Sequence, residues 1–98
     1  MRVVELGDSS IVVEKGPEDR EEFTIGSMFE DKTDPKVMIF VPSTSLMTYR
    51  INDYIYTEDT LIVYFKDSIP PEFELNARVG LKVGWEWYEA DYENSRTR

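Results

Sequence analysis

The chain consists of short runs of β-branched and aromatic residues, which Gly, Pro, Asn and Asp interrupt every few positions. Such runs favour strands and the interrupting residues favour turns. The main runs span residues 2–6, 10–14, 36–41, 46–51, 54–57, 60–66 and 78–87. This pattern predicts an all-β fold, either a compact antiparallel β-sandwich or a small barrel of about seven or eight short strands.

Short pairs of turn-favouring residues predict several of the turns. Gly7 and Asp8 are suited to a two-residue type II′ turn, because Gly supplies positive φ at the first central position. Asn52–Asp53 and Glu58–Asp59 separate three runs at hairpin spacing. Helix is expected at most as one short turn near residues 17–22, where a proline could occupy the first helical position. A plain charged loop is the alternative there.

The last long run alternates in a way that predicts one continuous strand. Its apolar residues at every second position are Val79, Leu81, Val83, Trp85 and Trp87. The phase reverses after Trp87, so the strand must bend, bulge or end, and Gly84 is a candidate for the irregularity.

A length of 98 residues predicts one domain, with residues 1–93 forming the β-rich domain and residues 94–98 a flexible C-terminal tail. The sequence contains no cysteine, so disulfides and thiolate metal sites are excluded. No apolar run is long enough for a transmembrane helix, and no secretory signal is visible. We therefore expect a soluble intracellular protein of the cytoplasm.

The charge balance restricts the class of partner. Twenty acidic against eleven basic residues give a net charge of −9, and neither half of the chain is basic. Nucleic acids and anionic membranes both need clustered Lys and Arg, so we predict neither direct nucleic-acid binding nor membrane binding. A protein partner with a basic surface is the better match, because the net negative charge of this chain attracts it.

The residues for common catalytic chemistry are missing. There is no His or Cys, no Gly-x-Ser-x-Gly segment and no Gly-rich phosphate loop. Carboxylate pairs are plentiful, but a chain of this length rarely builds the cleft that they would need. Turn acids such as Asp34, Asp53 and Asp59 do not follow a calcium-binding order. We therefore expect a protein that is not an enzyme and that has no metal site and no cofactor.

Two acidic segments are the candidate contact surface. The residues expected to bind a partner are Glu18, Asp19, Glu21, Glu22, Trp87, Tyr88, Glu89, Asp91, Tyr92 and Glu93. Aromatic side chains would anchor the partner, and the acids would select a basic one. The simpler alternative is that Trp85 and Trp87 belong to the core, while the acids form the solvated face of an edge strand.

Four further aromatics, Tyr49, Tyr54, Tyr56 and Tyr64, occur on the predicted middle strands. If those strands face one another, the tyrosines form a cross-strand ladder, which stabilises a sheet by about 0.2–1 kcal/mol per pair.

The primary functional hypothesis is a small acidic interaction module without catalytic activity. Alternate carboxylates on a strand lie about 6.6–6.8 Å apart and can imitate a row of phosphates. A sharper version, by analogy with accessory proteins of viruses and mobile elements, is a DNA mimic that inhibits a host nucleic-acid-binding protein. One alternative is a structural subunit of a larger assembly such as a virion, forming a homo-oligomer through an edge strand. Another is a carboxylate-based enzyme.

Overall fold

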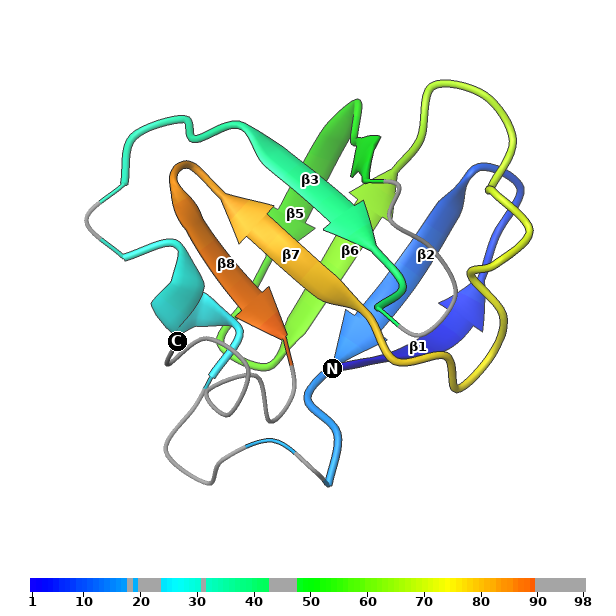
Figure 1. Cartoon of the computed structure of the whole chain (residues 1–98), viewed down its shortest axis with the longest axis horizontal. Helices are drawn as coiled ribbons and strands as arrows, with labels where there is room; N and C mark the ends of the chain where they lie inside the picture. The colour runs from blue at the N-terminus through cyan, green and yellow to red at the C-terminus, as the bar shows by residue number, and fades with distance from the viewer. Residues whose placement is uncertain (18, 20–23, 31, 43–47, 90–98) are drawn as a thin grey trace.

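The computed structural model describes residues 1–17, 19, 24–30, 32–42 and 48–89 (Figure 1). The strands in this part are β1 (Arg2–Leu6), β2 (Ser10–Glu14), β3 (Val37–Phe40), β4 (Tyr49–Arg50), β5 (Asp53–Tyr56), β6 (Thr60–Tyr64), β7 (Gly80–Val83) and β8 (Glu86–Glu89). They form two four-stranded antiparallel sheets, in the orders β1-β2-β6-β5 and β4-β3-β7-β8. The prediction of an all-β fold is confirmed. Its one described helical element is a 3₁₀ turn, η1 (Gly26–Met28).

Both sheets contribute to one hydrophobic core. Figure 1 shows β3, β7 and β8 as one layer and β2, β5 and β6 as the layer behind it. Alternate residues of each strand face inward, so Ile11, Val13, Leu61, Val63 and Leu81 are completely buried. Burying each aliphatic side chain stabilises the fold by about 1.5–3 kcal/mol, before the entropy cost of ordering the chain.

The two sheets are also joined along their sides. The chain runs from β4 into β5 through Ile51 and Asn52 and changes sheet there. The N–H of Ile51 donates to the carbonyl of Val37 at 3.4 Å, whereas the next N–H, from Asn52, donates to Tyr64 at 2.7 Å. On the other side β1 pairs with the segment before β7, since the N–H of Val3 donates to Ala77 at 3.0 Å. The architecture therefore combines sandwich layers with barrel-like closure.

The expected single strand over residues 78–87 is instead a hairpin. Val83 pairs with Glu86, and the turn between them consists of Gly84 and Trp85. Gly84 has φ of 65° and no positive φ occurs at Trp85, the pattern of a type II′ turn. The prediction of one strand was wrong, while Gly84 is confirmed as the source of the phase reversal. Trp85 lies at the turn and is 91% exposed.

The first hairpin differs from its predicted geometry as well. The N–H of Gly7 donates to the carbonyl of Ser10 at 2.8 Å, so the central turn residues are Asp8 and Ser9. Gly7 has no positive φ, and the predicted type II′ turn at Gly7–Asp8 was wrong. The expected helical turn near residues 17–22 falls almost entirely outside the described residues.

Residues 24–30, which contain η1, pack against one end of the sheet β1-β2-β6-β5. The N–H of Gly26 donates to the carbonyl of Glu58 at 3.2 Å, which fixes η1 against the β5–β6 turn. The buried ring of Phe29 stacks on Tyr54 and on Tyr56, with centroid distances of 5.2 and 4.3 Å. No helix in the described ranges is both long enough and apolar enough to cross a membrane.

The tyrosines do not form the expected cross-strand ladder. Tyr54 and Tyr56 lie on the same face of β5, where Phe29 contacts both rings. Tyr64 follows the buried Val63 and lies on the opposite face of β6, while Tyr49 packs edge-on against Phe73. The register and the sheet change at residues 51–52 therefore separate Tyr49 and Tyr64 from the neighbouring pair Tyr54 and Tyr56.

Candidate functional site

Most of the predicted contact residues lie outside what the structure describes. This applies to Glu18, Glu21, Glu22, Asp91, Tyr92 and Glu93, and to the side chains of Trp87 and Glu89, whose backbones belong to β8.

Asp19 is described, and its carboxylate is used within the fold. Its Oδ2 lies 2.7 Å from the N-terminal ammonium of Met1 and accepts a hydrogen bond from the N–H of Gly16 at 2.8 Å. The Asp19 side chain is only 4% exposed. It therefore connects the start of β1 to the segment after β2, and little of it faces solvent.

Tyr88 is also engaged within the molecule. Its ring is half-buried against the core, and its hydroxyl donates to Oε1 of Glu86 at 2.6 Å. Lys32 lies 3.8 Å from that carboxylate and 5.9 Å from the centre of the Tyr88 ring. At the nearby turn, the ammonium of Lys82 lies 5.6 Å from the Trp85 ring. Trp85 is therefore not a core residue.

The outer face of the sheet β1-β2-β6-β5 carries an aliphatic row that was not predicted. The register places Val12, Ile62 and Ile55 side by side on three neighbouring strands. They point outward, because the residues flanking them on β2 and β6 are buried. Ile55 is 53% exposed, and Val4 beside the row is 43% exposed. The sequence does contain a signal for this row. β2 and β6 are apolar at successive positions, and successive side chains point to opposite faces, so some apolar side chains must face outward.

Acidic residues surround this aliphatic row. Glu5 pairs with Val12 and continues the row onto β1, while Glu14 lies at one end of the face. Asp53 lies at the other end, opposite Tyr64. Arg2 is the base that the described strands place here, and its Nη1 donates to the carbonyl of Asn76 at 2.7 Å. The face thus has an apolar centre and a mainly acidic margin.

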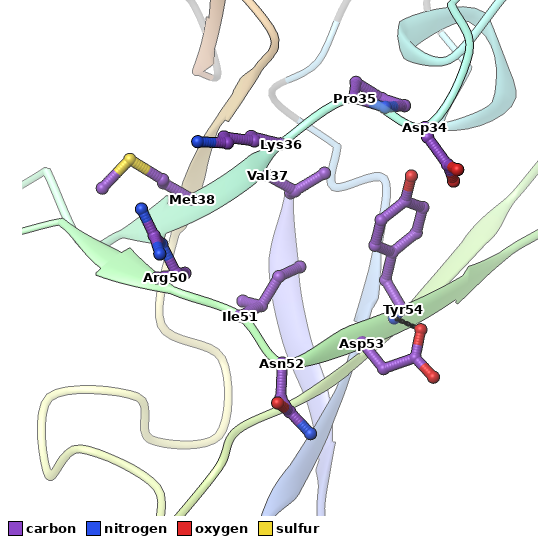
Figure 2. A pocket seen from close by; sticks show the side chains of 10 residues that line it. All are labelled: Asp34, Pro35, Lys36, Val37, Met38, Arg50, Ile51, Asn52, Asp53 and Tyr54. Carbon is purple, nitrogen blue, oxygen red and sulfur yellow. Dashed lines mark hydrogen bonds between the residues drawn. The ribbon is translucent and has the colours of Figure 1, made fainter.

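A pocket of about 310 Å³ opens where the chain changes sheets (Figure 2). β4 stays paired with β3, whereas β5 departs to pair with β6, so the strands diverge beyond Ile51. The lining residues are Asp34, Pro35, Lys36, Val37, Met38, Arg50, Ile51, Asn52, Asp53 and Tyr54. The pocket therefore results directly from the β4–β5 bend.

Opposite charges line opposite sides of this pocket. Figure 2 shows Lys36 and Arg50 on one side and Asp34 on the other. The buried side chains of Val37 and Ile51 lie between them. Asp53 follows at the lower margin, on the acidic side.

Tyr54 forms the wall on the acidic side, and its hydroxyl points toward Asp34 (Figure 2). Burial raises the pKa of Tyr54 above its ordinary value of 10.0, and the negative charge of Asp34 raises it further, with smaller effects from Tyr56 and Asp53. Asp34 itself has φ of 46°, a left-handed conformation that is uncommon for a residue other than Gly. Perturbed titration and unusual backbone both accumulate at functional sites.

Among the residues that the structure describes, no three acidic side chains lie close enough together to hold a metal ion. Comparison with models of known protein families, with curated proteins and with solved structures gave no match.

Proposed function

We propose that this chain is a small, acidic, non-catalytic module that binds a protein partner through the outer face of the sheet β1-β2-β6-β5. The observation that carries the proposal is the aliphatic row of Val12, Ile62 and Ile55 within an acidic margin. Ile55 is exposed, and the half-buried Val12 and Ile62 extend it into a continuous apolar surface across three strands, whereas single exposed apolar residues are ordinary.

The apolar and acidic side chains on this face would contribute to binding in different ways, which supports the proposal. Removing the aliphatic row from water would supply the non-directional driving force for association. The carboxylates of Glu5 and Glu14 would attract a basic surface and orient it, which affects association rate and specificity more than affinity. An apolar centre with a polar rim is the usual arrangement of protein interfaces. The net charge of −9 adds long-range attraction toward a basic partner.

Partner capture by matched variants tests this proposal. Ile55→Ser and Ile62→Ser remove apolar surface from the row. Leu75→Ser is the control matched to Ile55, because Leu75 is 57% exposed against 53% for Ile55 but lies in the loop before β7. Each purified protein is immobilised and exposed to lysate of its native host at low and high salt. Circular dichroism checks that every variant is folded.

We expect wild type and Leu75→Ser to retain the same partner, and the two row variants to retain about tenfold less, which corresponds to roughly 1.4 kcal/mol. High salt should weaken the complex because it screens the acidic margin. Equal capture by all four proteins would show that this face is not the binding surface.

Two versions of the proposal give different results in follow-up measurements. If the module mimics DNA, duplex DNA should release the captured partner in competition. If the module is instead a structural subunit, light scattering should show a wild-type oligomer that Ile55→Ser dissociates. The second result would replace the basic partner with a second copy of this chain.

A further inference from the structure

We propose that the pocket between β3 and the β4–β5 bend binds a small zwitterion that carries its two charges at opposite ends of an apolar chain, as an ω-amino acid does. Its carboxylate would face Lys36 and Arg50, and its ammonium group would face Asp34 and Asp53. This site shares Asp53 with the acidic margin of the outer face but none of the aliphatic row, and the inference goes beyond the protein-binding function proposed above.

The size of the pocket suits such a ligand. Its volume of about 310 Å³ lies at the lower end of the range of about 300–1,000 Å³ that is usual for ligand pockets. Val37 and Ile51 provide an apolar floor, and the half-buried ring of Tyr54 provides a wall. An apolar ligand body therefore has a surface to contact between the two charged sides.

The distribution of charge selects against simple ions. The acids repel an anion bound near Lys36 and Arg50, which lie opposite them (Figure 2). Likewise, Lys36 and Arg50 repel a cation bound near Asp34. A ligand that carries both charges at its two ends satisfies both sides at once. Charge-assisted hydrogen bonds of this kind are stronger than neutral ones.

Three of the four charged side chains at the pocket are available for a ligand, whereas Oδ1 of the fourth, Asp53, accepts a hydrogen bond from the N–H of Tyr54 at 2.8 Å. Among the described residues, Lys36, Arg50 and Asp34 form no ion pair and no side-chain hydrogen bond. They nevertheless lie around one concave site instead of being dispersed over a convex surface. All three are exposed, so a ligand reaches them directly from solvent.

The backbone on the acidic side supports the same inference. Asp34 adopts a positive φ of 46° immediately before Pro35, and its carboxylate lies toward the hydroxyl of Tyr54 (Figure 2). A non-glycine residue in this region carries a conformational cost that neighbouring structure must offset. Asn tolerates the same backbone region, so Asp34→Asn removes the charge while preserving the conformation.

Nuclear magnetic resonance titration with three matched probes tests the proposal. 6-Aminohexanoate carries both charges at opposite ends of an apolar chain, pentylamine carries the ammonium group without the carboxylate, and hexanoate carries the carboxylate without the ammonium group. We expect 6-aminohexanoate to shift the amide signals of Lys36, Arg50 and Tyr54, and to half-saturate at about tenfold lower concentration than either single-charge probe. Equal half-saturation by the three probes, or no shift at these amides, would overturn the proposal.

Variants that remove single charges test which side of the pocket binds each charged group of the ligand. Asp34→Asn should reduce the preference for 6-aminohexanoate over hexanoate, and Arg50→Gln should reduce the preference for 6-aminohexanoate over pentylamine. The controls are Asp67→Asn and Lys66→Gln, which remove exposed charges outside the pocket. Loss of 6-aminohexanoate binding in the controls to the same degree would indicate a general charge effect and contradict the assignment. Partner capture uses none of these variants, so either proposal can fail alone.

Discussion

The ring of Phe40 lies directly on the backbone of Gly80. The two residues pair across β3 and β7, and a methyl group built at Gly80 would come within 2.4 Å of Cζ of Phe40. Phe40 is only 6% exposed, although it points away from the central core. The missing side chain of Gly80 is therefore what allows an aromatic ring to cover this part of the sheet.

We expect Gly80→Ala to lower the free energy of unfolding by about 1–3 kcal/mol, because the ring must leave its position or the strands must separate. Urea denaturation measures this change. Gly7→Ala is the control: its methyl group would meet Oγ of Ser10 at 2.6 Å, and that hydroxyl can rotate away. If both variants lose the same stability, steric conflict with Phe40 is not the cause.

Gly84 is required for a different reason. A methyl group there would meet only Cβ of Pro35 at 3.9 Å, but φ is 65°. We expect Gly84→Ala to cost about 1–2 kcal/mol through backbone conformation alone. Gly84→Asn should cost less, since Asn enters this region more readily. Thermal unfolding of both variants checks the order, and an Asn variant as unstable as the Ala variant would contradict it.

Trp85 contributes little to folding. The side chain is 91% exposed and its described contact is with Lys82. We expect Trp85→Ser to change the free energy of unfolding by no more than about 1 kcal/mol, the upper value for an exposed cation–π pair. In the folded wild type, a soluble quencher should reduce the Trp85 fluorescence strongly. A difference spectrum between wild type and Trp85→Phe isolates that signal, and a protected emission would contradict the exposed position.

Two tyrosines with raised pKa values should make the folded state less stable at alkaline pH. Burial and Asp34 raise the pKa of Tyr54, while the pKa of Tyr49 is raised by its hydrogen bond to Glu72, which measures 2.6 Å. The folded state therefore retains these protons more strongly than the unfolded state does. Their contribution to stability is present below the ordinary pKa of 10.0 and is lost as pH rises through the higher folded values.

The measurement is urea unfolding at about pH 9 and about pH 11, on either side of the ordinary tyrosine pKa. We expect wild type to lose more stability between these values than Tyr54→Phe, which has no proton to lose at that position. Absorbance titration of the folded protein should show late ionisation that disappears in the same variant. An identical pH dependence of the two proteins would contradict the linkage.

The sequence alone determined the class of fold and the places of several strands. Residues 2–6 and 10–14 were predicted as strands, and β1 and β2 have the same limits. Such predictions succeed because strand propensity, side-chain alternation and turn residues act over a few neighbouring positions. The charge of −9 likewise follows from composition.

Tertiary structure decided where the candidate sites lie. The aliphatic row exists only because the pairing register aligns Val12, Ile62 and Ile55, and no local pattern fixes that register. The pocket depends on the change of sheet at residues 51–52, which opens a space where Asp34, from the loop before β3, faces Tyr54 of β5. The physical reason is that strand pairing joins distant segments through contacts that form only when the whole core assembles, so local sequence cannot specify them.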